Sequence, residues 1–207
     1  MKNEIEVIDN FLPDYYFKQL QSRLLGNRMP WFYNEHILDK HIGKNTKFQF
    51  IHTFYDIRPE YNGETDCYSL IRNPLNMICQ KLKVTKLYRI KANLRSKSFF
   101  TRSGGGYHID GYDCSHTSIY YVNTNNGYTL FKDGNFKVDS VANRMVIFDS
   151  SKLHKGVRCT DEKTRVVINF NYFTFEYGSK DQTAESIKSF TESDNGLINP
   201  IGDLKKQ

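Results

Sequence analysis

The sequence predicts an α+β fold that is mainly β, in which helices near the N-terminus support a sandwich, barrel or jelly roll of short strands. Apolar residues recur with helical spacing in two early segments, and from about residue 85 onward they alternate with a period of two. The chain also contains 15 Phe and 14 Tyr against one Trp, and aromatic residues favour pleated sheet. Helices followed by strands are typical of α+β packing.

The first predicted elements are a strand and a helix. Residues 5–9 form a short apolar alternation that indicates a strand. The helix is predicted to begin at Pro13 and to end at Gly26, since proline suits a first turn and glycine a C-terminus. Its apolar face consists of Tyr16, Phe17, Leu20 and Leu24.

Residues 29–64 are mixed in polarity and rich in aromatic residues, so we expect loops and an edge strand there. A second helix is predicted to begin at Pro74 with Asn73 as its N-cap. Four apolar residues then recur at helical spacing, namely Leu75, Ile78, Cys79 and Leu82. The two helices would brace one face of the sheet that follows.

The remaining strands are predicted where residues alternate between turn signals rich in glycine and asparagine. They cover residues 86–94, 117–123, 128–131, 136–139, 144–148, 156–159 and 165–175. From Gly178 onward the sequence is polar. We therefore expect a single domain over residues 1–177 and a polar C-terminal tail over residues 178–207.

Composition narrows the partners and the compartment. No run approaches the roughly 18 apolar residues of a membrane span, and the first residues are too polar for a signal peptide. The four cysteines have no zinc-binding spacing, so we expect reduced thiols in a cytoplasmic protein. The net charge of +6 comes from dispersed basic residues, which favours a solvated surface over a nucleic-acid groove.

A candidate metal site is formed by His108, Asp110 and His154. Residues i and i+2 of a strand project to the same face, so His108 and Asp110 could bind one ion, and His154 could come from another strand. Two imidazoles and one carboxylate suit non-haem Fe(II) and leave positions open for other ligands. A His-x-Asp tripeptide also arises by chance, and single histidines are more often structural. The remaining histidines, at positions 36, 41, 52 and 116, are interpreted as surface or structural residues.

Arg165 strengthens the metal hypothesis. In the strand that it begins, alternation places Arg165, Val167, Asn169 and Asn171 on one face, and Val166, Ile168, Phe170 and Tyr172 on the other. The polar face could simply be exposed to solvent. If it lines a cavity instead, the guanidinium needs an anionic partner, and a dicarboxylate such as 2-oxoglutarate provides one.

The chain resembles the Fe(II)- and 2-oxoglutarate-dependent dioxygenases of the prolyl 4-hydroxylase-like group, including small phage-encoded members. The resemblance covers residues 85–175, the expected core, and rests on five motifs: residues 107–110, 118–123, 143–149, 153–154, and Arg165 with its strand. It implies a double-stranded β-helix, or jelly roll. It also implies that His108, Asp110 and His154 bind iron, and that Arg165 and Tyr121 bind the distal carboxylate of 2-oxoglutarate.

The family places a further co-substrate side chain on the strand ahead of the His-x-Asp motif. Here the stretch from Tyr88 to Gly106 is longer and basic, so Tyr88 and Asn93 are both candidates. Independently of the resemblance, alternation puts Asn169 and Asn171 on the face of Arg165, so both would point toward the metal if that face lines a cavity. The resemblance thus implies Arg165, Tyr121 and either Asn93 or Tyr88 as co-substrate residues, and the strand alternation adds Asn169.

The activity implied by the resemblance is hydroxylation of a C–H bond in a protein or peptide side chain such as that of proline. Its cofactors would be Fe(II), 2-oxoglutarate and O2, with ascorbate as an optional addition. The carboxylate at Asp110 favours hydroxylation over halogenation, which uses a small residue there. Two alternatives stay open: the same chemistry on a free metabolite or a nucleobase, and a non-catalytic jelly-roll binding module.

Overall fold

The computed structural model describes residues 5–35, 48–58, 63–64, 71–99, 106–110 and 114–174. Two helices are present in these residues, α1 (Asp14–Leu25) and α2 (Arg72–Lys81), and one 3₁₀ turn, η3 (Asp133–Asn135). The strands are β1 (Glu6–Ile8), β2 (Phe32–Asn34), β3 (Gln49–Asp56), β4 (Gly63–Glu64), β5 (Lys86–Ser96), β6 (His116–Tyr121), β7 (Tyr128–Phe131), β8 (Lys137–Asp139), β9 (Arg144–Asp149), β10 (His154–Val157) and β11 (Thr164–Phe173). None of the described helices is long and apolar enough to cross a membrane.

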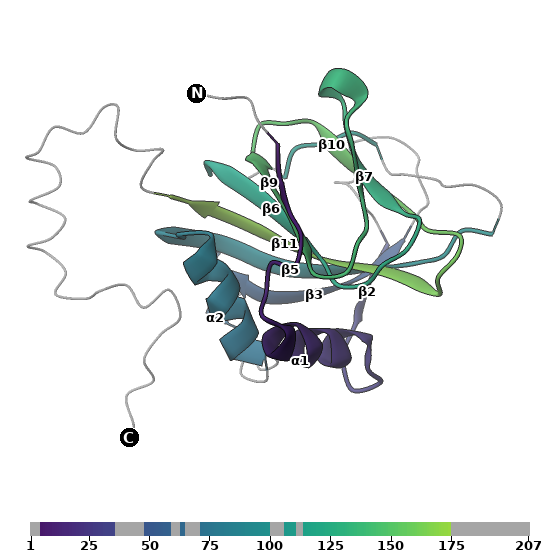
Figure 1. Ribbon diagram of the computed structural model, residues 1–207, viewed down its shortest axis with the longest axis horizontal. Helices are drawn as coiled ribbons and strands as arrows, with labels where there is room; N and C mark the ends of the chain where they lie inside the picture. The colour runs from purple at the N-terminus through teal and green to yellow at the C-terminus, as the bar shows by residue number, and fades with distance from the viewer. Residues whose placement is uncertain are drawn as a thin grey trace, which may run out of the picture.

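The strands form two antiparallel sheets (Figure 1). The larger one follows the order β1-β9-β6-β11-β5-β3-β2, with β4 paired to β3 as well, and the smaller one follows the order β10-β7-β8. Helices α1 and α2 lie on one side of the larger sheet, and β7 and β10 lie on the other (Figure 1). The predicted fold class, a mainly β jelly roll with supporting helices, is confirmed.

Two apolar cores separate these layers. The outer core joins the helices to the larger sheet and includes Leu20, Leu24, Leu75, Ile78, Ile90, Ala92, Val166, Ile168 and Phe170. The inner core lies between the two sheets and includes Ile119, Tyr121, Phe131, Val138, Val146, Phe148 and Val167. Both faces of the central strands are therefore covered, and polar side chains on the inner face are enclosed between the sheets.

The predicted helices are present with one corrected boundary. Helix α1 is flanked by Pro13 and Gly26 as expected. Helix α2 begins at Arg72, with Ile71 in the N-cap position, so the predicted start at Pro74 and the predicted cap at Asn73 are wrong. The N–H groups of a first helical turn have no intrahelical partner, so a proline in that turn costs no hydrogen bond. The helix can therefore begin at Arg72, ahead of Pro74.

The segment 29–64 contains more sheet than expected. Strand β2 pairs with β3 alone and is the predicted edge strand, but the eight-residue β3 lies between β2 and β5 in the sheet. The sequence pattern does not predict strand β3, because polar Gln49, His52 and Asp56 are buried among its aromatic residues. Polarity therefore does not alternate along β3 as it does along a half-exposed strand.

Most of the later strands match the predicted ranges within two residues, and two differences affect the site. Strand β10 begins at His154, two residues before the predicted start, because that residue pairs with Phe131 of β7. Strand β5 continues to Ser96, which pairs with Thr164 of β11, beyond the predicted end at Leu94. The predicted tail, residues 178–207, lies outside the described residues, as do His36 and His41.

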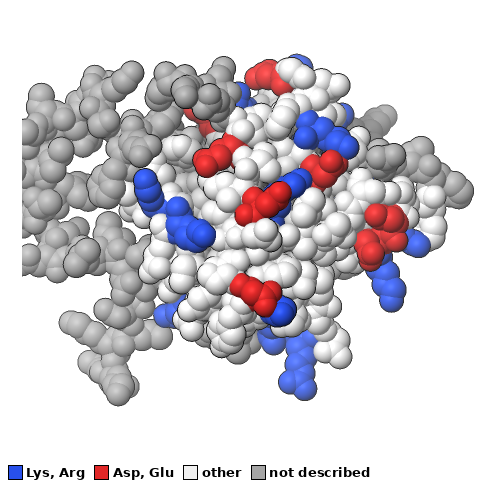
Figure 2. Space-filling model, in the orientation of Figure 1, with Lys and Arg blue, Asp and Glu red and all other residues white. Residues whose placement is uncertain are grey.

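Charged side chains of both signs are interspersed over the face of the molecule shown in Figure 2. Several cations on this chain lie beside an acid, as Lys137 does beside Asp139 at 2.7 Å and Lys18 beside Asp14 at 2.6 Å. Such exposed pairs contribute little to stability. These two pairs place part of the basic charge at the exposed surface.

Candidate active site

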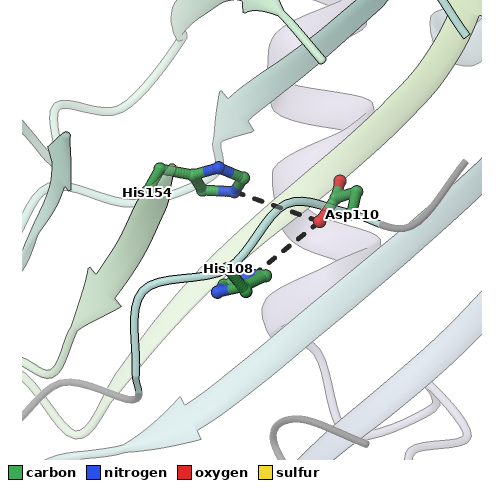
Figure 3. A group of neighbouring side chains, drawn as sticks. All are labelled: His108, Asp110 and His154. Carbon is green, nitrogen blue, oxygen red and sulfur yellow. Dashed lines mark ion pairs between the residues drawn. The ribbon is translucent and has the colours of Figure 1, made fainter. Parts of the chain in front are cut away.

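His108, Asp110 and His154 come together between the two sheets (Figure 3). Their ligand atoms all lie within 4.8 Å of one another. Asp110 Oδ1 is 3.8 Å from Nε2 of His108 and 3.9 Å from Nε2 of His154. These separations suit three groups that would share one ion.

The backbone brings the two histidines together by a route that the sequence interpretation missed. His108 and His154 form an isolated antiparallel bridge, in which each backbone N–H donates to the other's carbonyl at 3.0 Å. Residues 109 and 110 are not part of a strand, so the predicted strand alternation of His108 and Asp110 is wrong. The histidines are instead direct cross-strand neighbours, with ring centroids 4.7 Å apart.

Both imidazole rings have a fixed orientation. Nδ1 of His154 lies 3.0 Å from the carbonyl oxygen of Lys152, and Nδ1 of His108 lies 3.2 Å from that of Gly106. A carbonyl only accepts, so each Nδ1 carries the hydrogen and each Nε2 presents its lone pair to the site. Burial, together with the nearby His154, lowers the pKa of His108, which favours the neutral imidazole that binds metals.

Asp110 is held through one of its two oxygens. Its Oδ2 accepts a hydrogen bond from Asn171 Nδ2 at 2.9 Å and lies 3.4 Å from Nη2 of Arg89. Burial by itself would raise the pKa of Asp110, but Arg89 and the other neighbouring groups outweigh it and hold that pKa at about 2. The carboxylate is therefore ionised, with Oδ1 left for the histidine side.

This donor set fits Fe(II). Two imidazole nitrogens and one carboxylate oxygen form the combination that non-haem Fe(II) sites use. Every one of the three side chains also has a supporting hydrogen bond that sets its orientation. The ring of His154, only 2% exposed, packs against Phe148 with centroids 4.9 Å apart, which excludes water from that side.

Arg165 is buried, so the interpretation of its strand face as solvent-exposed is excluded. The side chain is 3% exposed, and it donates from Nε to Ser140 Oγ at 2.8 Å and from Nη2 to Thr129 Oγ1 at 3.1 Å. Tyr121 also donates to Thr129 Oγ1, at 2.7 Å, and its ring lies 5.5 Å from the guanidinium. No described acid forms an ion pair with Arg165. Arg165 is thus a buried cation without an anionic partner among the described residues. A carboxylate ligand would provide that partner.

The two asparagines share the inner face with Arg165. Asn93 of β5 pairs with Val167 of β11, and Asn169 of β11 pairs with Lys91 of β5. Asn93 is buried, and Oδ1 of Asn169 is buried without a hydrogen-bond partner. The alternative candidate, Tyr88, packs on Phe173 with ring centroids 5.6 Å apart.

The other two described histidines have structural roles, as expected. Nδ1 of His52 lies 2.8 Å from the carbonyl oxygen of Pro30, and the ring is 3% exposed. His116 stacks on Tyr172 with centroids 5.6 Å apart. Neither is part of the candidate metal site.

The sequence interpretation missed a row of cations on β5. Arg89, Lys91 and Arg95 lie on the inner face, where they pair with Asn171, Asn169 and Arg165 of β11. A signal was present, because these residues alternate with the apolar Ile90, Ala92 and Leu94. The sequence predicts a strand over residues 86–94, but the basic residues of its inner face are not among the predicted site residues.

Lys91 gives a stability prediction with a defined pH dependence. Burial, reinforced by repulsion from Arg89, lowers the pKa of Lys91 from 10.5 to about 8. The unfolded chain then binds more protons than the folded one between these pH values, so this residue makes stability rise with pH in that window. In metal-free protein at pH 7, Lys91→Met is expected to be more stable than wild type by about 1–3 kcal/mol.

The measurement is urea unfolding of wild type and Lys91→Met at several pH values from 7 to 10.5. The stability difference should narrow steadily above pH 8 and vanish near the upper limit. Lys137→Met serves as the control for the loss of a lysine side chain at an exposed position. A constant difference for Lys91→Met would contradict the lowered pKa.

Comparison with known proteins finds similarity in three-dimensional structure. No protein-family model matches the sequence, and no curated protein matches it. A prolyl hydroxylase from Trichoplax adhaerens, solved with a hypoxia inducible factor oxygen degradation domain peptide fragment, superposes with a TM-score of 0.60 at 15% identity, over 87% of this chain and 88% of that chain.

Two bacterial structures show the same likeness. An oxidoreductase of the 2OG-Fe(II) oxygenase family from Burkholderia pseudomallei has a TM-score of 0.58 at 11% identity, covering 81% of this chain and 84% of that one. A Pseudomonas putida prolyl-4-hydroxylase has a TM-score of 0.51 at 14% identity, covering 82% and 92%. The chain therefore has the jelly-roll fold of the 2OG-Fe(II) oxygenases and prolyl hydroxylases.

Proposed function

We propose that this protein is an Fe(II)- and 2-oxoglutarate-dependent dioxygenase that hydroxylates a C–H bond. One observation carries the proposal: a histidine, aspartate and histidine converge within 4.8 Å, and a buried arginine without a described acidic partner contacts β7, the strand that pairs with the strand of His154. A metal ligand set and an anion-binding group are the two parts that such chemistry requires. The fold that holds them is shared with 2OG-Fe(II) oxygenases.

The proposal assigns a role to each group. His108, Asp110 and His154 hold Fe(II), and Arg165 binds the distal carboxylate of 2-oxoglutarate beside the Tyr121 ring. Bound Fe(II) supplies the activation of O2, coupled to decarboxylation of 2-oxoglutarate to succinate, with ascorbate as an optional addition. The described residues of the chain bind and orient the reactants and exclude water from them.

Further residues have positioning and lining roles in the proposal. Arg89 and Asn171 orient the Asp110 carboxylate through its Oδ2. Asn93 and Asn169 line the inner face of the sheet that faces the co-substrate. Phe131 and Phe148 pack around His154 and keep water from the ligand ring.

We propose a protein or peptide side chain, such as that of proline, as the acceptor. The motifs shared with prolyl 4-hydroxylase-like proteins support this choice. Ile109 supports it too, because it lies between the two ligands of the His-x-Asp motif and is 49% exposed, which offers an apolar contact beside the site. A cytoplasmic location is part of the proposal, supported by the free thiols of Cys79, Cys114 and Cys159.

The test is succinate formation. Protein purified without oxygen is loaded with Fe(II) and 2-oxoglutarate and exposed to air, with and without ascorbate, beside a His154→Ala variant. Wild type is expected to form succinate, and the variant at least about 100-fold less, because a ligand matters more than the groups that only support ligands. If wild type forms no succinate and binds neither Fe(II) nor 2-oxoglutarate, the non-catalytic binding module replaces this proposal.

A further inference from the structure

A second guanidinium lies beside Arg165. Arg95 of β5 is its cross-strand partner and is 5% exposed. Its Nη1 donates to the carbonyl oxygen of Gly156 at 2.8 Å. Its Nε and Nη2 are buried and have no hydrogen-bond partner. Two charged N–H donor groups are thus removed from water with nothing to accept from them.

This arrangement is costly unless an anion is present. Burial lowers the pKa of Arg95 to about 9, and repulsion from Arg158 and then Arg165 contributes further. No described acid forms an ion pair with Arg95. Buried charges in proteins are normally paired, so adjacent unpaired guanidinium groups indicate a site for an anionic ligand.

The unpartnered atoms of Arg95 are those that bind carboxylates elsewhere in this chain. Arg144 binds Asp9 through Nε at 2.6 Å and Nη2 at 2.9 Å. Arg58 binds Asp56 through the same two atoms, at 3.0 Å and 2.9 Å. Nε and Nη2 form the edge of the guanidinium that donates two parallel hydrogen bonds to one carboxylate.

In Arg165 the same edge is already hydrogen-bonded within the protein. Its Nε and Nη2 donate to Ser140 and Thr129, which leaves Nη1 as its remaining nitrogen. Of the two neighbouring arginines, Arg95 therefore has its bidentate edge available for a ligand, and Arg165 has Nη1 available. Together they could donate to both oxygens of one carboxylate.

Gly156 brings the two guanidinium groups to one place. A Cβ atom at this position would lie 3.4 Å from Nη1 of Arg165 and 3.6 Å from Nη1 of Arg95. Gly156 lies two residues after the ligand His154 on β10. The absence of a side chain therefore leaves room beside both arginines, one alternation of the strand away from the candidate metal site.

We infer that Arg95 is a second co-substrate-binding arginine, which together with Arg165 holds the distal carboxylate of 2-oxoglutarate. This inference rests on the proposed function and adds a specificity-determining residue to it. Two guanidinium groups at the distal end favour a dicarboxylate 2-oxo acid over a 2-oxo acid that ends in a methyl group. A methyl group there would leave both buried cations unpaired.

The test compares two ligands of equal chain length by isothermal titration calorimetry. Protein loaded with Mn(II) in place of Fe(II), so that no turnover occurs, is titrated with 2-oxoglutarate and with 2-oxopentanoate. Arg95→Gln is expected to raise the Kd for 2-oxoglutarate by about 30-fold, because it removes a buried charged partner. Its Kd for 2-oxopentanoate should stay within about 2-fold of the wild-type value, since that ligand has no distal carboxylate.

Two further variants complete the design. Arg144→Gln is the matched control, because it removes a guanidinium that binds a carboxylate through the same edge but lies outside the site. Its affinity for both ligands should equal that of wild type. Arg95→Lys keeps the charge without the fork, so its Kd for 2-oxoglutarate should rise by about 5- to 10-fold. If the melting curve of Arg95→Gln shows that this variant is unfolded, the Kd of Arg95→Lys is compared with that of wild type instead.

The outcomes separate the inference from the proposed function. An unchanged Kd for 2-oxoglutarate in a folded Arg95 variant would overturn the inference while the proposed function stands. An equal loss of affinity for both ligands would overturn it as well, because it would place the effect of Arg95 away from the distal carboxylate. If wild type binds no 2-oxoglutarate at all, the proposed function fails and the inference fails with it.

Discussion

Asp110→Asn is expected to abolish succinate formation from 2-oxoglutarate, with a loss of more than about 100-fold. The substitution keeps the size of the side chain but removes the one acid of the candidate metal site among the described residues. A neutral amide is a poorer ligand than an ionised carboxylate for a divalent cation. Fe(II) affinity, measured by equilibrium dialysis without oxygen, should fall together with the rate.

The fold should survive this change. An asparagine at position 110 could still accept a hydrogen bond from Asn171, which now contacts Asp110 Oδ2 at 2.9 Å. Asp139→Asn is the matched control, because its carboxylate is 53% exposed beside Lys137 and should not affect turnover. A folded Asp110→Asn protein with the wild-type rate would contradict the assignment of Asp110 as an iron ligand.

Arg165→Gln is expected to weaken 2-oxoglutarate binding by about 100-fold or more. The reason is that removing one partner of a buried charge pair costs about 2–5 kcal/mol, and every 1.4 kcal/mol is tenfold in affinity. Fe(II) affinity should be unchanged, because Arg165 contacts Ser140 and Thr129 and none of the three metal-site residues. Calorimetric titration of 2-oxoglutarate into the Mn(II)-loaded variant measures the loss.

The melting temperature distinguishes a binding role of Arg165 from a structural one. The variant loses two hydrogen bonds to hydroxyl groups, but it also removes a buried cation that has no described acidic partner, so we expect no large destabilisation. Lys137→Gln, at an exposed position on β8, is the control for loss of a positive charge. Normal 2-oxoglutarate affinity in Arg165→Gln would argue against this residue as the distal anchor.

The inner face of the larger sheet carries a group of neighbouring basic residues. The outer face in Figure 2 mixes both signs, whereas Arg89, Lys91, Arg95 and Arg165 lie together on the inner face of β5 and β11. Only Arg89 among them contacts the Asp110 carboxylate. The net charge of +6 therefore does not indicate where the buried basic residues lie.

Local patterns were sufficient to predict most of the elements. Strand β7 has the predicted bounds, and helix α1 lies between the predicted Pro13 and Gly26. Both depend on spacing and on residues with strong conformational preferences, which act over a few positions. The long strand β3 was missed because its buried polar residues are stabilised by neighbours from distant parts of the chain.

The candidate metal residues could also be named from the sequence, but the reason for their convergence could not. His108 and Asp110 do not share a strand face. They meet His154 because His108 and His154 exchange backbone hydrogen bonds across 46 positions of the chain. A pairing of this kind depends on how the segment before β6 passes β10, and no local pattern contains that information.

The sequence by itself determined which residue types occur at which spacing: the helices before the sheet, the alternation of β5 and β11, and the histidine, aspartate and arginine of the candidate site. Only the tertiary structure decided which polar groups meet. The register of β11 against β5 pairs Arg165 with Arg95, and the same register, offset by six residues, brings Asn171 and Arg89 to Asp110. Register is set by burying both sheet faces at once, and that is a property of the whole packed molecule.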